Sequence, residues 1–351
     1  FSNGVRQVMG TRVTEQQILE YLCINIPHEK DHRLTNIERV TVGWSHETWL
    51  FDLITTVNGV ERTLPLCLRR DPGNTLLRNL SNLETQFKVL QCLEKTKLLA
   101  PKVYWYESDT KILGAPFLVM EKVSGVCPSP WGKNGRDFYE KASRRGVLPV
   151  DFSKTLAILH TLDWKKSGLE FLGVPSPDRG FALAEINKWK SLIDVSDHQP
   201  EPILTDLIYW LEENAPLSQR VTLVHGAYRT GNILIEEDRI SAVLDWELQT
   251  LGDPMYDVAY VLSDLNREGT NLLSNVVDRD IFFETYESMT GWTIDEKICR
   301  YYDALYAMRS VAFWMSASGL YASGRSDDIR LARTAWSVTV VLERAAKNLG
   351  Y

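Results

Sequence analysis

Two oxygen-bearing side chains, Asn232 and Asp245, offer the clearest chemistry in this sequence. Asn232 ends the stretch His225–Asn232, and Asp245 follows thirteen residues later, after an apolar segment. The residues between them read as strand, acidic turn and strand, so a hairpin would bring the two side chains near each other. An amide oxygen and a carboxylate suit Mg²⁺, which prefers oxygen ligands and shares its coordination shell with phosphates. Taken singly, Asp245 would also fit a turn or cap, and Asn232 an Asx-turn.

The position five residues before Asn232 is occupied by Ala227. A phosphoryl-transfer site of the protein-kinase type needs an acid there, which orients and deprotonates the acceptor hydroxyl. A methyl group cannot accept a proton, and loss of a general base typically costs about 10² to 10⁴ in rate. Magnesium and nucleotide binding would survive, because the two oxygen ligands remain. Ala227 is therefore interpreted as the base position, vacant as written.

Arg229 follows the base position by two residues. A cation at this offset faces the transferring phosphoryl group in kinases, where it stabilises negative charge. An ordinary surface arginine is the alternative. His225 ends the apolar strand Val221–Val224 and is interpreted as a buried, hydrogen-bonded scaffold residue rather than a proton shuttle. His160, on an apolar helix, is interpreted as scaffold as well.

The stretch Leu223–Ala259 resembles the aminoglycoside phosphotransferase family. Within that family it is most similar to the kinase-like domains found beside acyl-CoA dehydrogenases. The resemblance rests on His225–Asn232, on Leu244–Glu247 and on Leu251–Asp257, with Ala227 in place of the family's aspartate. It implies a two-lobed, protein-kinase-like fold that uses ATP (or GTP) and Mg²⁺ to phosphorylate a hydroxyl of a small molecule.

The first 120 residues read as a β-rich lobe. Two segments with capping-box spacing, Thr14–Gln17 and Ser81–Glu84, each predict the start of a helix, the first over about 14–25. Asn58-Gly59 predicts a tight hairpin turn. Strands are expected over 37–41, 47–57, 61–70, 102–107 and 115–120.

From Asp137 onward the pattern is mostly helical, which completes an α+β fold. We therefore expect a small antiparallel β lobe with a helix over 1–122, and a larger, mainly helical lobe over 123–351 that carries the catalytic loop, the metal site and the acceptor pocket. Short strands are expected over 222–225, 233–235 and 240–244. Helices are expected over about 137–161, 182–195, 202–214, 254–265, 278–290, 295–318 and 327–348.

Arg69 is the candidate for holding the nucleotide phosphates from the β lobe. The strand Leu66–Arg70 resembles the one that carries the phosphate-pairing lysine of protein kinases, although plain solvent exposure of Arg69 is the alternative. Its expected partner is a glutamate from the next helix. Glu84 is that candidate, but it also completes the predicted capping box, and Gln86 aligns about as well.

Two further segments of the first lobe are candidates for nucleotide contacts. Gly43–Thr48, with Ser45, occupies the place of the family's phosphate-covering loop, and a plain hairpin turn is an equally good interpretation. Phe117–Val123 resembles the inter-lobe hinge. There, Glu121 and Val123 would contribute backbone groups to an adenine ring, unless the segment is only a buried edge strand.

Composition narrows the class of protein. A length of 351 residues favours two packed lobes, and a net charge of -7 argues against a nucleic-acid partner. The five cysteines show no CxxC spacing, which predicts neither a disulfide framework nor a zinc site. No signal-peptide pattern or membrane-length apolar run is evident, so a cytoplasmic location without a membrane partner is expected.

Ala227 leaves two explanations open. Either alanine was introduced into an active phosphotransferase, or this is a natural member that no longer catalyses. The intact surroundings of position 227 favour an active scaffold changed at its base. A catalytically silent protein that binds a nucleotide or metabolite is the alternative, and a regulatory module with an empty cleft is a third. The acceptor is expected to be a small molecule with a hydroxyl, and the resemblance does not identify it as an aminoglycoside.

Overall fold

The computed structural model describes residues 13–40, 46–73, 80–176, 178–194, 201–267, 269–326 and 328–349. The chain divides into two compact units. Unit 1 comprises the described parts of Phe1–Gln91 and Pro101–Val123, and unit 2 comprises those of Cys92–Ala100 and Ser124–Tyr351. Residues 92–100, which the sequence-based division placed in the first lobe, thus belong to unit 2.

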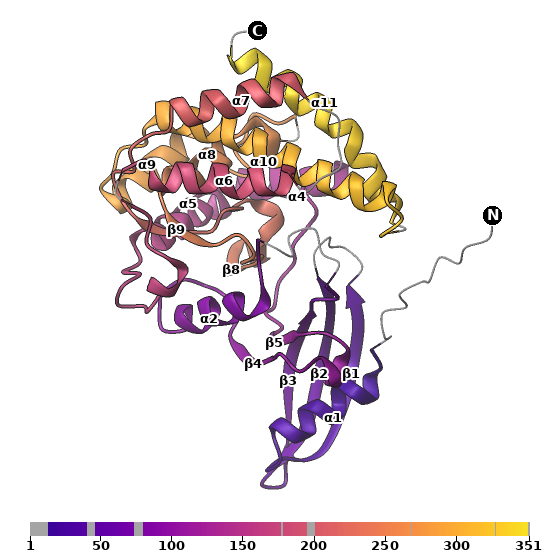
Figure 1. Ribbon diagram of the computed structural model, residues 1–351. Helices are drawn as coiled ribbons and strands as arrows, with labels where there is room; N and C mark the ends of the chain where they lie inside the picture. Colours follow the sequence, from indigo (N-terminus) through magenta and orange to yellow (C-terminus); the bar gives the residue numbers. More distant parts are fainter. Residues whose placement is uncertain are drawn as a thin grey trace, which may run out of the picture. The chain divides into compact units, whose positions relative to one another are not determined.

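Unit 1 is built on a five-stranded antiparallel sheet with the order β1-β2-β3-β5-β4 (Figure 1). The turn between β2 and β3 has positive φ at both Asn58 and Gly59, as a type I′ turn requires. The strands are β1 (Lys30–Val40), β2 (Glu47–Val57), β3 (Val60–Arg70), β4 (Val103–Glu107) and β5 (Phe117–Glu121).

Strand β1 starts seven residues earlier than the sequence predicted. Its pairing with β2 is irregular near Asp31 and Asn36, which both have positive φ. Each irregularity shifts the side-chain alternation, so the strand shows no continuous period of two in the sequence. The register with β2 is regular over Arg33–Thr35 and again over Glu38–Val40, of which only the second stretch was predicted.

Helix α1 (Glu15–Asn25) covers the core of this sheet. Thr14 and Gln17 form the predicted capping box, and Ile18 and Leu22 pack among apolar residues of β2, β3 and β5. Helix α2 (Leu83–Leu93) begins differently from the prediction, because Asn82 accepts the hydrogen bond from the amide of Thr85. The short helix α3 (Thr110–Leu113) precedes β5.

Unit 2 is mainly helical. The single helix predicted over 137–161 is two helices, because Gly146 takes a left-handed conformation (φ 80°) that ends the first and begins the second. Helix α10 packs against α6, α7, α8 and α11 (Figure 1). The α-helices are α4 (Lys133–Arg145), α5 (Val147–Thr161), α6 (Gly180–Asp194), α7 (Pro202–Glu213), α8 (Met255–Leu262), α9 (Arg279–Thr290), α10 (Glu296–Ala322) and α11 (Ile329–Leu349).

Two small antiparallel pairs of strands interrupt the helices of unit 2. Strands β7 (Ile233–Glu236) and β8 (Arg239–Val243) form the predicted hairpin, and β6 (Thr222–Val224) pairs with β9 (Thr250–Gly252). The sequence analysis missed β9, which is only three residues long. A short 3₁₀ turn, η2 (Thr230–Asn232), leads into β7.

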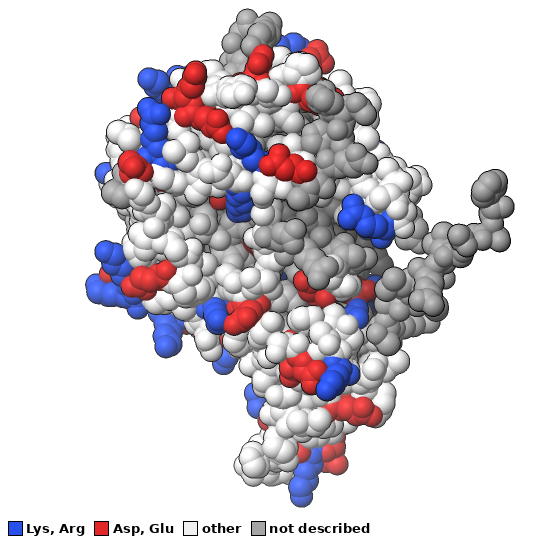
Figure 2. Space-filling view, in the orientation of Figure 1, with Lys and Arg blue, Asp and Glu red and all other residues white. Residues whose placement is uncertain are grey.

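Surface charge and helix hydropathy add two observations. On the face seen in Figure 2, the coloured acidic and basic residues are interspersed over both units. Among the helices of the described ranges, none combines the length and the apolar character needed to cross a bilayer.

Candidate active site

The loop 225–232 connects β6 to β7 and is held at its start by a buried carboxylate. Asp257, in the first turn of α8, accepts hydrogen bonds from the backbone amides of His225 (2.7 Å) and Gly226 (2.8 Å). The Asp257 side chain has no solvent exposure, and hydrogen bonds to an ionised acceptor are stronger than neutral ones. Asp257 thus fixes the start of the loop.

His225 joins the loop to the residue before Asp245. Its Nε2 lies 2.8 Å from the carbonyl oxygen of Leu244, and its Nδ1 lies 3.1 Å from the amide nitrogen of Ala227. This pattern fits a neutral imidazole that donates through Nε2 and accepts through Nδ1. Burial lowers the pKa of His225, which favours the same neutral form. The geometry matches the scaffold function that the sequence suggested.

The main chain of Ala227 is fully engaged. Its amide donates to His225, and its carbonyl accepts a hydrogen bond from Nδ2 of Asn232 at 2.9 Å. The residue is 6% exposed. Because these contacts involve only backbone atoms at position 227, the same two hydrogen bonds are available to any residue other than proline there.

Asn232 and Asp245 lie at the same end of the β7–β8 hairpin. The amide of Leu244 donates to the carbonyl of Asn232 (2.8 Å), so the residue preceding Asp245 is hydrogen-bonded directly to Asn232. Because the side-chain nitrogen of Asn232 donates to Ala227, its side-chain oxygen is the end left to act as a ligand. Asp245 is half-buried and has a φ of 66°, a conformation that aspartate tolerates better than most residues.

The chemistry of this pair fits magnesium. An amide oxygen and a carboxylate match the cation's preference for oxygen, and such sites use one or two carboxylates together with phosphate oxygens. Across the residues with described positions, no group of three or more His, Cys, Asp or Glu side chains could hold a metal. A magnesium ion held by Asn232 and Asp245 would take its remaining ligands from other sources, such as phosphate oxygens or water.

Arg229 belongs to the loop, and its guanidinium packs against an aromatic ring. Its guanidinium lies over the ring of Trp131, 5.1 Å from the centroid. Within the described part of the chain, Nη1 of Arg229 is buried and has no hydrogen-bond partner. A Cβ at Gly231 would come within 2.5 Å of this nitrogen, so a larger residue there would require the guanidinium to shift. A buried cationic N–H without an acceptor is suited to receive an anion.

Arg309 of α10 is a residue that the sequence analysis missed. It donates through Nη1 to the carbonyl of Gly226, the residue before the base position. Its guanidinium also lies 5.1 to 5.4 Å from the ring centroids of Trp189, Tyr260 and Tyr306. Nothing in the local sequence marks Arg309, which sits in an apolar helix 83 residues from its partner.

Unit 1 places Arg69 beside Gln86. Nη1 of Arg69 lies 3.4 Å from Oε1 of Gln86, and Nη2 lies 3.0 Å from Nδ1 of His46. Gln86 is 1% exposed, whereas Glu84 is half-exposed and pairs with Lys88 at 2.6 Å. Of the two candidates, Gln86 therefore faces Arg69. Glu84 lies on the outer side of α2, because two residues along a helix change the face.

The other candidates in unit 1 are less defined. Ser45 falls in 41–45, outside the described residues, together with Gly43 and Trp44 of the predicted phosphate-covering loop. The amide of Glu121 donates to the carbonyl of Lys102 (2.8 Å), so this N–H is used within the sheet. Val123 is half-buried at the end of unit 1. Nucleotide contacts by Ser45, Glu121 and Val123 stay predictions.

Two curated relatives each match a little over half of the chain. Acyl-CoA dehydrogenase family member 10 of Mus musculus is 32% identical over 197 residues, which cover 56% of this chain and 18% of that protein. Acyl-CoA dehydrogenase family member 11 of Rattus norvegicus is 34% identical over 200 residues, covering 55% of this chain and 24% of that protein. The chain thus spans about a fifth to a quarter of the length of these relatives.

Solved structures share the fold along almost the whole chain. A putative aminoglycoside phosphotransferase from Ralstonia eutropha has a TM-score of 0.69 at 23% identity, over 96% of this chain and 98% of that one. A ternary complex of the aminoglycoside phosphotransferase APH(4)-Ia with AMP-PNP and hygromycin B has a TM-score of 0.59 at 14% identity, over 95% and 99%. These likenesses show a kinase-like α+β fold.

The comparison with protein families covers most of the chain. Residues 36–292 match the phosphotransferase enzyme family, a span that includes Arg69, the loop 225–232 and Asp245. Since well over half of the chain is matched, and the fold agrees, the chain belongs to the phosphotransferase enzyme family.

Proposed function

We propose that this chain binds ATP (or GTP) with Mg²⁺, and that its scaffold transfers the terminal phosphoryl group to a hydroxyl of a small molecule. In the form with Ala227, the transfer step is strongly impaired. One observation carries the proposal: the backbone hydrogen bond from Leu244 to Asn232 holds the residue before Asp245 against Asn232, so the two candidate metal ligands lie at one end of a hairpin. The loop beside them keeps its conformation without an acidic side chain.

Each candidate residue has a distinct task in this scheme. The oxygens of Asn232 and Asp245 would hold magnesium, which neutralises phosphate charge when bound. Arg229 would stabilise the negative charge of the phosphoryl group during transfer, because its buried Nη1 lacks a hydrogen-bond partner in the described chain and can donate to a phosphate oxygen. Arg69 would bind the α- and β-phosphates, and Ser45, Glu121 and Val123 would contribute further nucleotide contacts.

Structural neighbours support the proposed use of a nucleotide and of a small molecule as acceptor. APH(4)-Ia was solved with the ATP analogue AMP-PNP and hygromycin B, and another neighbour, APH(2″)-IIa, with gentamicin. Both bound compounds, hygromycin B and gentamicin, are small molecules. At such low sequence identity the shared fold supports a small molecule as the acceptor, but it does not support these antibiotics. We therefore propose a small compound with a hydroxyl group as the acceptor.

Restoring the acid tests the proposal. Ala227→Asp should raise the rate of phosphoryl transfer at least about a hundredfold, because a general base contributes roughly 10² to 10⁴. Hydrolysis of ATP and GTP, with water as the acceptor, provides an assay that needs no known substrate. The matched control is Ala227→Asn, because asparagine has nearly the shape of aspartate but lacks the carboxylate that would act as the base. Equal rates in the aspartate and asparagine variants would refute the function assigned to position 227.

A catalytically silent binding protein is the second candidate. It is favoured by the fully satisfied backbone at Ala227, which keeps the loop ordered without an acid. Calorimetry with Mg-AMP-PNP separates the two functions when it is combined with the rate assay. Binding in both forms without any gain in rate in Ala227→Asp supports the silent protein, and absence of binding in both forms removes both candidates.

A further inference from the structure

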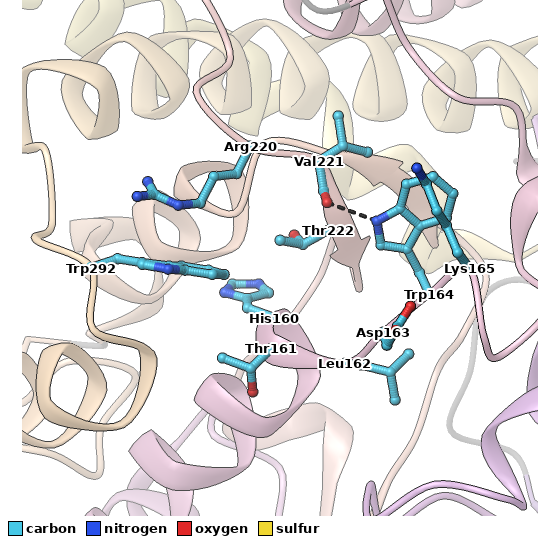
Figure 3. Close-up of a pocket in the computed structure, with 10 residues that line it drawn as sticks. All are labelled: His160, Thr161, Leu162, Asp163, Trp164, Lys165, Arg220, Val221, Thr222 and Trp292. Atoms are coloured by element: carbon cyan, nitrogen blue, oxygen red, sulfur yellow. Dashed lines mark hydrogen bonds between the residues drawn. The ribbon is translucent and has the colours of Figure 1, made fainter.

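A pocket in unit 2 contains none of the residues proposed for phosphoryl transfer. It has a volume of about 530 Å³, which falls within the range of roughly 300 to 1,000 Å³ typical of small-molecule sites. Its walls come from the end of α5 and the segment after it, from the start of β6, and from the loop after α9 (Figure 3). The lining consists of His160, Thr161, Leu162, Asp163, Trp164, Lys165, Arg220, Val221, Thr222 and Trp292.

Two cations line this pocket, and each lies over an aromatic ring. Arg220 lies over the ring of Trp292, 4.8 Å from the centroid, and Lys165 lies 5.2 Å from that of Trp164. Neither Arg220 nor Lys165 forms an ion pair with any residue of the described ranges. The one acid of the lining, Asp163, is paired with Lys166 at 2.9 Å. The pocket therefore presents net positive charge.

The aromatic walls are fixed in place. The indole nitrogen of Trp164 donates to the carbonyl of Val221 (2.9 Å), as Figure 3 shows. His160 is 1% exposed, and its ring nitrogens lie 2.7 Å from the hydroxyl of Tyr286 and 3.3 Å from the carboxylate of Asp257. Because the indole nitrogen of Trp164 already has a partner, the exposed part of this ring offers a ligand mainly apolar surface, and buried His160 lies behind the pocket wall. Cations beside such surface suit a flat organic anion.

The pocket is connected to the catalytic loop through one carboxylate. The oxygen of Asp257 that contacts His160 also accepts the amide of His225, and the other oxygen accepts the amide of Gly226. A ligand that displaces His160 would alter the acceptor of both loop amides. When two sites contact the same side chain, here Asp257, binding at one site can change the affinity of the other.

We propose that this pocket is a regulatory site for a flat organic anion, such as an aromatic carboxylate, which acts on the loop 225–232 through His160 and Asp257. The proposal stands independently of the reaction that the loop supports. It has two parts, the binding of the anion and its effect on the loop, and each has its own test.

Binding is tested with naphthalene-2-carboxylate on protein labelled with 5-fluorotryptophan. The ¹⁹F resonances of Trp164 and Trp292, assigned with Trp164→Phe and Trp292→Phe, should shift and saturate together. Arg220→Gln should weaken this binding about tenfold, as loss of one charge-assisted contact predicts. The control Arg279→Gln changes an arginine that also stacks on an aromatic ring but is paired with Glu296, and it should leave the affinity unchanged.

Two comparison probes decide the ligand class. Naphthalene-2-carboxamide has the same ring without the charge, and inorganic phosphate has charge without a ring, so both should bind much more weakly than the acid. Equal affinity for the carboxamide or for phosphate would overturn the assigned chemistry. No saturable shift of the Trp164 and Trp292 resonances with the acid would overturn the site itself.

The effect on the loop is tested by hydrogen exchange. Saturating naphthalene-2-carboxylate should change the exchange rates of the His225 and Gly226 amides at least about threefold, because both depend on the position of Asp257. The amide of Phe51, in the core of unit 1, serves as the reference. The same concentration of probe should have a smaller effect on Arg220→Gln. Bound probe with unchanged loop exchange would refute the regulatory part of the proposal.

Discussion

The loop 225–232 in unit 2 and the surroundings of Arg69 in unit 1 are built in different ways. The loop is held through its backbone, by the buried carboxylate of Asp257, by His225 and by Arg309. Arg69 contacts its neighbours through side chains, including those of Gln86 and His46. We therefore expect changes around the loop to act mainly on folding stability, and changes around Arg69 to act mainly on nucleotide affinity.

The largest expected effect tests the backbone anchor of the loop. Asp257→Asn should lower the free energy of unfolding by about 2 to 4 kcal/mol, because a buried N–H that loses its acceptor costs roughly 1 to 3 kcal/mol. Urea unfolding followed by circular dichroism measures this change. The control is Asp280→Asn, at an exposed position in the first turn of α9. If both variants lose equally little stability, the loop is not anchored by Asp257.

The second prediction concerns the pH dependence of folding stability, which Asp253 of unit 2 should influence. Burial raises the pKa of Asp253 to about 6, so the folded state favours the protonated carboxyl. This contribution to stability is complete below about pH 4 and is lost as the pH rises through about 6. Relative to wild type, Asp253→Asn should therefore gain about 3 kcal/mol between pH 4 and pH 7. Urea unfolding at several pH values checks this, and parallel stability curves would contradict it.

The third prediction separates the metal contribution from the phosphate contribution. Asp245→Asn should weaken binding of Mg-AMP-PNP about 10- to 100-fold and leave metal-free nucleotide binding unchanged, because it removes a proposed ligand charge. Arg69→Gln should weaken binding about tenfold with or without magnesium, because it removes a phosphate contact. Calorimetry with and without EDTA measures both. If nucleotide binding by the two variants depended equally on magnesium, Asp245 and Arg69 could not be assigned separately to the metal and to the phosphates.

The smallest expected effect concerns the support of Arg69. Gln86→Leu should weaken nucleotide affinity about fivefold, because a side-chain hydrogen bond contributes roughly 1 kcal/mol. Glu84→Leu should have no effect on affinity, because the Glu84 side chain pairs with Lys88 instead. The two positions lie on the same helix and differ only in the face they occupy. A larger loss of affinity in Glu84→Leu would reverse the assignment.

Local sequence signals predicted much of the fold. The capping box at Thr14, the turn at Asn58-Gly59 and the acidic turn between β7 and β8 each depend on a few neighbouring residues, so spacing alone reveals them. Errors arose where backbone geometry departs from a simple period, as at the irregular pairs of β1 or the left-handed Gly146. Short β9 carries no period at all.

The support of the loop was harder to predict than its chemistry. Asn232 and Asp245 stand out because their types and spacing fit one ion. Arg309 and Asp257 act on the loop from helices distant in sequence, and only the packing of α8 and α10 brings them there. The choice between Glu84 and Gln86 likewise depended on the rotation of α2, which the sequence did not determine.

The positive φ of Asp245 limits what can replace it. At φ 66° most side chains strain the backbone, whereas asparagine and glycine are accommodated. A routine alanine scan at this position would therefore combine a conformational penalty with the loss of a carboxylate, and it would overstate the importance of the charge. The same restriction narrows evolutionary drift here, since a descendant can discard the negative charge through asparagine while keeping the bend of the chain.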